Sequence, residues 1–279
     1  MRHQIKSWIF KTLEWFPEGA GNWMYHQLQR INENSLKDEY TFQVSTLNRF
    51  ADILSQHHLL FKDKVVVELG SGWLPVVPYE LILIHNAARV LTFDINQHYS
   101  DSKIKQLSLL YNSLYGFNLS PGLLPNVHYY PKTNILNHKF ESAVDVFLSR
   151  NVLEHVAPAD LYEIHQQMFN SLHHNSFVIH QISPSDHRAY TDRSLSLWDF
   201  LRYSQEEWDK IQTRFDYHNR WRLPHYIGMF KQCGFEVMYC SFKSHKADQK
   251  LPDKIHKEFG MFTLEELTAG NILIILKKK

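Results

Sequence analysis

Glu68 is the first residue whose position points to ligand binding, because it lies between an apolar run and a glycine-containing turn. The turn is Gly70-Ser71-Gly72, and a segment with helical character follows it. Glycines let the backbone turn sharply and approach a ligand without a Cβ clash. A dinucleotide site requires a third glycine where Pro75 stands, and the charge of Glu68 would repel a pyrophosphate. The turn instead suits a ligand that carries an ammonium group and a sulfonium.

Asp94 is a second acidic residue at the end of an apolar run. A carboxylate at the tip of the second parallel strand is placed to accept hydrogen bonds from both hydroxyls of a ribose. An isolated aspartate after a strand more often caps a turn or a helix. Its position after the glycine turn favours the ribose.

Three histidines lie at or beyond predicted strands, near the edge where open α/β sheets bind ligands. His155 follows the fourth strand, His180 lies within the fifth, and His187 follows the fifth. Histidine suits a general base because its unperturbed pKa is about 6.5. We expect His187 to be the base, with His155 as the alternative. His180 is expected to contact the acceptor, which is the second substrate that such a base would deprotonate. The alternative is that His180 is a hydrogen-bonded core residue.

A metal is the other interpretation of these side chains. Glu154, His155 and His187 together would suit a divalent cation, although Asn151 stands where a further acid would help. The sequence favours a site without metal, and the cation remains the alternative.

The elements that must position these residues follow from the hydrophobic pattern. Residues 1–60 have helical spacing, with a break at 17–21 and further helices expected at 22–31 and 41–57. From Lys64 onward, short apolar runs alternate with amphipathic segments, which predicts an α/β fold with a mostly parallel sheet covered by helices. The runs lie at 65–69, 90–95, 127–130, 144–149, 176–182, 235–240 and 271–276.

The segment 183–222 is too long for a simple connection between a strand and a helix. It is rich in Trp, Tyr and Arg, which suit sugar rings, phosphates or carboxylates. We expect it to form a cap that contacts the acceptor through Asp186, Arg220 and Arg222. The alternative is a helical flap whose aromatic side chains form a small core of their own.

Composition limits the classes of partner. The chain has 279 residues, 44% of them hydrophobic, and a net charge of +1, which gives no electrostatic footprint for nucleic acid. No apolar stretch approaches the roughly 20 residues that cross a bilayer. Lys6 and Lys11 interrupt any signal peptide, so we expect a cytoplasmic protein.

The N-terminal segment has two interpretations. Residues 1–40 are expected to form a lid or wall over the site. Peripheral membrane contact is the alternative, because aromatic and basic side chains alternate as in an interfacial helix. These side chains are Trp8, Phe10, Trp15 and Phe16 beside Arg2, Lys6 and Lys11.

Over 62–276 the sequence resembles the class I S-adenosylmethionine-dependent methyltransferases. Residues 68–72 are similar to their acidic-x-Gly-x-Gly motif, with Leu74 where many members have a third glycine, and Asp94 matches their ribose-binding acid. Residues 144–156 are similar to the fourth-strand motif, and Asn134 stands near the position of an adenine-contacting acid. The resemblance implies a seven-stranded Rossmann-like sheet with an antiparallel last strand. It implies S-adenosylmethionine as cofactor, bound by Glu68, Gly70, Ser71, Gly72, Asp94, Asn134, Ser149 and Asn151.

A narrower resemblance covers 180–240, where motifs such as His218-Asn219-Arg220 look like those of bacterial methyltransferases of polysaccharide and lipid-linked glycan biosynthesis. It implies O-methylation of a saccharide or glycolipid. One alternative is another small metabolite, methylated at oxygen, nitrogen or carbon. The other is a non-catalytic binding protein of the same fold, against which the intact residues Glu68, Gly70, Gly72 and Asp94 argue.

Overall fold

The structure of the chain is a computed structural model. It describes residues 3–17, 19–21, 24, 25, 28, 35–140, 144–244, 246 and 250–278, and for residues 3–6 the backbone alone. The helix expected at 22–31 lies largely outside these residues.

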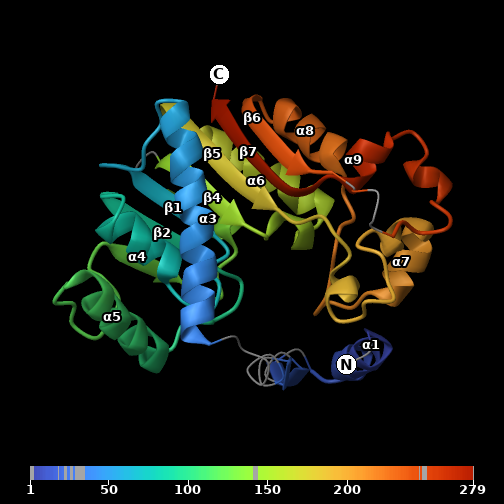
Figure 1. The fold of residues 1–279 in the computed structure, drawn as a ribbon, viewed down its shortest axis with the longest axis horizontal. Coiled ribbons are helices and arrows are strands. Elements are labelled where there is room, and N and C mark those ends of the chain that lie inside the picture. Colours follow the sequence, from blue (N-terminus) through green and yellow to red (C-terminus); the bar gives the residue numbers. More distant parts are fainter. Residues whose placement is uncertain are drawn as a thin grey trace.

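Within the described residues, seven strands form one sheet in the order β3-β2-β1-β4-β5-β7-β6 (Figure 1). β7 runs antiparallel to both of its neighbours, whereas the remaining pairs are parallel. The predicted Rossmann-like α/β fold with its antiparallel last strand is therefore confirmed. The strands are β1 (Val65–Leu69), β2 (Arg89–Phe93), β3 (Val127–Tyr130), β4 (Val144–Arg150), β5 (Leu172–Ile182), β6 (Phe235–Lys243) and β7 (Gly270–Lys278).

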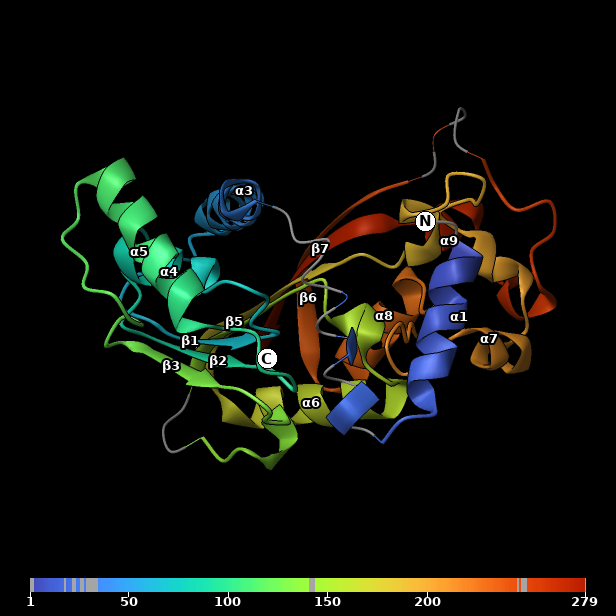
Figure 2. The same ribbon diagram turned by 90° about the horizontal axis from the view of Figure 1, so that it is seen from below.

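Helices cover both faces of the sheet, which explains why its central strands are apolar on both sides. Val146 and Leu148 of β4 face α3 and α4, whereas Phe147 faces α6 and α8. Figure 2 shows α3, α4 and α5 on one side of the sheet and α6 on the other. These helices are α3 (Leu36–Gln56), α4 (Val76–Leu83), α5 (Asp101–Tyr115), α6 (Pro158–Ser171) and α8 (Leu223–Gln232).

The start of α3 corrects the predicted helix at 41–57, because the helix begins one and a half turns earlier, at Leu36. Ser35 Oγ accepts a hydrogen bond from the backbone N–H of Asp38 at 3.1 Å, which satisfies one of the unpaired donors of the first turn. The carboxylate of Asp38 also interacts favourably with the positive end of the helix dipole. Hydrophobic spacing alone does not indicate where this helix starts. The sequence feature that does is the capping residue Ser35.

The N-terminal helix α1 (His3–Glu14) packs against the segment that follows β5 (Figure 2). Lys11 Nζ donates to the carbonyl of Lys210 at 2.9 Å, and the Phe10 ring lies 6.0 Å from that of Phe215. Phe10 is thereby buried, whereas Trp8 and Trp15 are exposed. Within the described residues, none of the helices has the length and apolar character that a bilayer crossing requires.

The cap is larger than the expected segment 183–222, because residues 251–267 pack into the same cluster. Trp198 and Trp208 form the centre of this cluster together with Phe259. The alternative in which the aromatic residues form their own core therefore holds for these two tryptophans. The short helices here are η3 (His187–Tyr190), η4 (Asp199–Arg202), α7 (Gln205–Ile211), η5 (Lys257–Phe259) and α9 (Leu264–Thr268).

The turn between β1 and α4 depends on two glycines with left-handed backbones, Gly70 at φ +84° and Gly72 at φ +63°. A Cβ on Gly70 would lie 2.3 Å from Val152 Cγ2, whereas a Cβ on Gly72 would meet nothing within 4 Å. The Gly70 N–H donates to the carbonyl of Phe93 at 2.9 Å, which joins the ends of β1 and β2. Gly70 is thus required by close packing as well as by conformation.

We predict that Gly70→Ala lowers the free energy of unfolding by more than Gly72→Ala. The left-handed conformation costs an alanine about 1–2 kcal/mol at either position, and forced repacking around Val152 adds about 1–3 kcal/mol at Gly70. Urea unfolding of the two variants measures the difference. Equal losses would show that the turn does not depend on its approach to Val152.

Candidate functional site

Asp94 lies at the end of β2, where it holds the glycine turn in place. Its Oδ2 accepts from the backbone N–H of Ser71 at 3.0 Å, and its Oδ1 accepts from the N–H of Asn96 at 2.8 Å. The side chain keeps an exposed fraction of 11%. Glu68, Gly70, Ser71, Gly72 and Asp94 are therefore brought together at one edge of the sheet, as the sequence predicted.

Aromatic side chains that were not predicted as site residues surround this turn. The rings of Trp73 and His98 lie 4.5 Å apart, and those of Tyr99 and Tyr129 stack at 4.1 Å. The Tyr99 hydroxyl donates to the carbonyl of Ser71 at 3.1 Å. The sequence feature that could have identified them is their position, because these residues lie just after the glycine turn or near the ends of β2 and β3. They give the turn flat, apolar walls.

Glu68 is a buried carboxyl, with an exposed fraction of 4%. The Thr92 hydroxyl donates to its Oε2 at 2.6 Å, yet burial raises the pKa of Glu68 to about 8. Arg150 at the end of β4 opposes this rise through its charge, and burial in turn lowers the pKa of Arg150. A buried carboxyl and a half-buried guanidinium thus act on each other beyond the turn. Arg150 belongs to the fourth-strand motif but was not predicted as a site residue.

Two of the predicted cofactor-binding amides lie beside this edge. Asn134 is exposed, and its Oδ1 accepts from the N–H of Leu136 at 3.0 Å as the cap of η1 (Ile135–Asn137). Asn151 has a left-handed backbone at φ +54° and a buried Oδ1 without a hydrogen-bond partner. It lines a cavity of about 530 Å³ between α3 and the strand ends, together with His187.

Ser149 and His180 were predicted to contact cofactor and acceptor, and the structure corrects both. Their side chains are fully buried on the sheet face that α6 and α8 cover. Ser149 Oγ lies 2.7 Å from His180 Nδ1, and His180 Nε2 lies 3.2 Å from Nε2 of His165. Burial holds the pKa of His180 well below its usual value. His180 is therefore the hydrogen-bonded core histidine of the alternative interpretation.

Glu154, His155 and His187 lie together, although they come from two separate loops. η2 (Leu153–His155) follows β4, and η3 follows β5. One ligand atom from each of the three side chains lies within 4.8 Å of the others. His155 Nδ1 donates to the carbonyl of Tyr217 at 2.8 Å, so its Nε2 carries the lone pair. The two histidines predicted as bases thus share one site.

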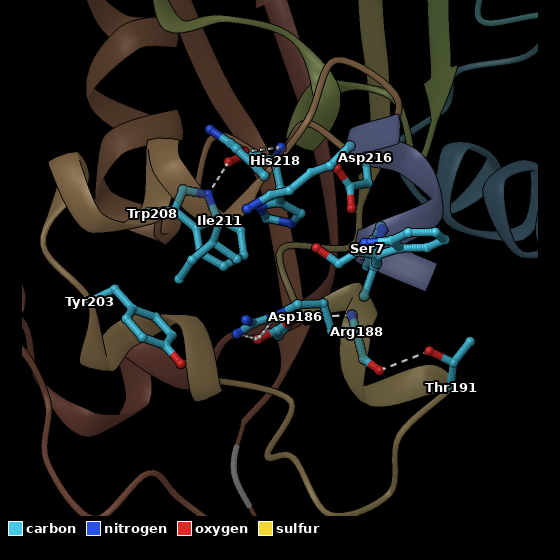
Figure 3. A pocket seen from close by; sticks show the side chains of 13 residues that line it. Ser7, Asp186, Arg188, Thr191, Tyr203, Trp208, Ile211, Asp216 and His218 are labelled. Atoms are coloured by element: carbon cyan, nitrogen blue, oxygen red, sulfur yellow. Dashed lines mark hydrogen bonds and ion pairs between the residues drawn. The ribbon is translucent and has the colours of Figure 1, made fainter. Parts of the chain in front are cut away.

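A cavity of about 400 Å³ lies between α1 and the cap, and His187 forms part of its wall. Figure 3 shows Ser7 of α1, Arg188 of η3 and Trp208 of α7 around this space. Since His187 also lines the cavity beside Asn151, it lies between the two. The wall consists of Ser7, Trp8, Lys11, Asp186, His187, Arg188, Thr191, Tyr203, Trp208, Ile211, Gln212, Asp216 and His218.

Asp186, Arg220 and Arg222 were predicted to bind the acceptor, but each is engaged within the cap. Asp186 Oδ2 pairs with Arg188 at 2.6 Å and accepts from the N–H of Phe200 at 3.0 Å. Arg220 donates to two backbone carbonyls and to Gln205 Oε1. Arg222 is fully buried and donates to three backbone carbonyls. Burying a charged group without partners is costly, so each of these side chains is bound within the cap. Because these partners come from different segments, the contacts hold the cap together.

No family model matches the sequence, and no curated protein is significantly similar to it. Among solved structures, magnesium protoporphyrin IX methyltransferase from Synechocystis PCC 6803, with S-adenosylhomocysteine bound, has a TM-score of 0.50 and 11% identity, covering 91% of this chain and 94% of that one. An S-adenosylmethionine-dependent methyltransferase from Methanosarcina mazei has a TM-score of 0.48 and 18% identity, covering 80% and 95%.

A candidate sarcosine dimethylglycine methyltransferase from Galdieria sulphuraria has a TM-score of 0.49 and 16% identity. That match covers 72% of this chain and 63% of the other, so the chain spans less than two thirds of its length. Identities this low show the fold alone, which is the Rossmann-like fold of methyltransferases.

The raised pKa of Glu68 predicts a dependence of stability on pH. The folded protein binds this proton more tightly than the unfolded chain, whose glutamate titrates near 4.5, so stability falls as pH rises from about 5 to 8. Glu68→Gln removes the titration, and the wild type should lose more stability than this variant, by an amount on the order of a few kcal/mol. Urea unfolding at several pH values measures it. Parallel pH profiles for the two proteins would contradict the account of Glu68.

Proposed function

We propose that the chain is an S-adenosylmethionine-dependent methyltransferase. The observation that carries the proposal is the arrangement of Glu68, the glycine turn and Asp94 at one sheet edge. When bound, the donor supplies a methyl group on a positively charged sulfur. The remaining work, which is binding, orientation, exclusion of water and removal of a proton, falls to the residues of this chain.

The residues around the turn fit the nucleoside part of such a donor. Gly72 faces open space, so a ligand can approach its backbone closely. Asp94 would accept hydrogen bonds from the ribose hydroxyls, and the faces of Trp73 and Tyr99 would pack against the base. Asn134 would contact the adenine edge from the end of β3.

The amino-acid part of the donor carries both an ammonium and a carboxylate. Glu68 and Arg150 complement these two charges. A cation beside Glu68 would favour the ionised carboxylate, because an opposite charge offsets the effect of burial on the pKa. Asn151 would lie beside this end, since it follows Arg150 directly.

We propose that the acceptor is a hydroxyl of a saccharide or glycolipid and that it occupies the cavity under α1. The support is the aromatic part of the wall, where Trp8 and Tyr203 offer flat faces on which sugar rings pack. α1 would act as the predicted lid, because Ser7, Trp8 and Lys11 belong to the same wall. Another small metabolite remains the alternative acceptor.

A hydroxyl is a poor nucleophile at neutral pH, so its proton must leave as the methyl group is transferred. The cluster of Glu154, His155 and His187 is the proposed place of proton removal. His187 is the favoured residue because it lines the cavity proposed for the acceptor and also the cavity beside Asn151, which is a proposed donor contact. His155, whose ring centroid lies 4.9 Å away, would orient the acceptor.

Donor binding is tested by calorimetry with S-adenosylhomocysteine. We expect Asp94→Ala to weaken binding by a few kcal/mol at most, since two charge-assisted hydrogen bonds are lost. Asp101→Ala, an exposed aspartate at the start of α5, is the matched control and should bind like the wild type. An Asp94→Ala variant with wild-type affinity would mean that the ribose lies elsewhere.

Turnover is tested with a donor labelled in its methyl group and a panel of saccharides and glycolipids. We expect His187→Ala to lower kcat by roughly 10²–10⁴-fold, the usual contribution of a general acid–base group. Donor affinity should stay unchanged, because His187 belongs to the loop after β5 and not to the glycine turn that is proposed to bind the donor. If the variant keeps normal turnover, proton removal moves to His155, and if both variants keep it, the acceptor is a nitrogen nucleophile.

A further inference from the structure

Glu154 is a buried carboxyl that the hydrogen-bond network of the protein leaves half satisfied. Its side chain is fully buried, and Oε1 accepts from the backbone N–H of Ser183 at 3.2 Å. Oε2 is buried without any hydrogen-bond partner. Protonation does not remove the problem, because a neutral carboxyl would also bury an unpaired donor or acceptor. The carboxyl therefore requires a partner that the protein itself does not provide.

Two imidazoles lie at the position of such a partner. One nitrogen each of His155 and His187, together with a carboxylate oxygen of Glu154, form a group whose atoms lie within 4.8 Å of one another. Atoms bound to one tetrahedral ion at about 2.1 Å lie about 3.4 Å apart, so small side-chain rotations close the group. Two histidines and one carboxylate make a set that binds Zn²⁺ and other first-row divalent ions.

The outer contacts of both rings are those of metal-binding histidines. His155 Nδ1 donates to the carbonyl of Tyr217 at 2.8 Å, and His187 Nε2 donates to that of Ser183 at 3.3 Å. A carbonyl partner fixes the tautomer and leaves the lone pair on the opposite ring nitrogen. Ser183 thus contacts two members of the group, since its N–H is bound to Glu154.

His218 packs against the same rings but does not belong to the ligand set. Its ring centroid lies 5.2 Å from that of His187 and 5.9 Å from that of His155. His218 Nδ1 accepts from the N–H of Arg220 at 3.0 Å, so the proton of the neutral ring is on Nε2. Because the backbone already engages Nδ1, His218 packs beside the group without joining it.

We propose that Glu154, His155 and His187 bind a divalent transition-metal cation, at a site that adjoins the two cavities through His187. The three side chains leave part of the coordination sphere open, as in catalytic zinc sites. Because His187 lines the cavity under α1, an acceptor in that cavity would be able to approach the cation from the side of His187. A hydroxyl bound there would lose its proton at a lower pH. With the cation bound, His187 would act as a ligand of the cation, and this role would replace that of a free base. This consequence rests on the proposed function, whereas the binding of the cation does not.

The test uses the full chain, stripped with a chelator and titrated with Co²⁺ as a spectroscopic probe and with Zn²⁺ in a calorimeter. We expect one equivalent of tight binding and the visible absorption of Co²⁺ with nitrogen and oxygen ligands. Glu154→Gln and His187→Ala should each weaken binding by roughly 100-fold or more. Mg²⁺ should not compete, because it prefers oxygen ligands in octahedral geometry.

His173→Ala provides the matched control, since His173 is an exposed histidine at the start of β5. It should bind Co²⁺ like the wild type. Unchanged affinity in Glu154→Gln, or equal losses in this variant and in His173→Ala, would overturn the proposal. S-adenosylhomocysteine titrations on the same variants check that the turn at Gly70 is intact. A failure of metal binding is thereby distinguished from a failure of the proposed donor site.

Discussion

The packing of Gly70 against Val152 is the contact on which the rest of the site depends. A Cβ at Gly70 would lie 2.3 Å from that side chain. The turn after β1 therefore contacts the loop after β4 so closely that a larger residue at Gly70 would not fit. Asp94 adds the end of β2 through its hydrogen bond to Ser71. Three strand ends are thus held at fixed positions, with the buried Glu68 and the half-buried Arg150 at these ends. Rigid strands hold groups more accurately than loops do, which is what a reaction between two bound molecules requires.

A second constraint acts on the cap, whose charged side chains are directed inward. Arg222 is fully buried with three carbonyl partners, and Asp186 is held by Arg188 and by the backbone of Phe200. Such interactions contribute little net stability, because removing charges from water offsets what they gain. Their effect is on position, since they fix the loop that carries His187 against the strand ends. The arrangement places His155 beside His187, which lines both cavities.

The sheet and the glycine turn could be predicted because their signals are local. The apolar run before Glu68 predicts a strand, and Gly70 and Gly72 predict a sharp turn after it. Both features are visible within a few neighbouring residues of the sequence. Ser149 and His180 were assigned wrongly because their strands have two faces, and both point under α6 and α8. The arginines of the cap could not be assigned, since their partners lie in segments far apart, such as Leu267 for Arg222. The grouping of Glu154 with His187 likewise depends on how β4 and β5 pair.

The central claim is that the edge formed by β1, β2 and β4 binds the methyl donor. A crystal structure of the full chain grown with S-adenosylhomocysteine tests it most directly. The account predicts the ribose hydroxyls on Asp94, the base among the rings near Trp73, and the amino-acid end towards Glu68 and Arg150. A nucleoside bound in the cavity under α1, or a site left vacant at saturating ligand, would contradict it.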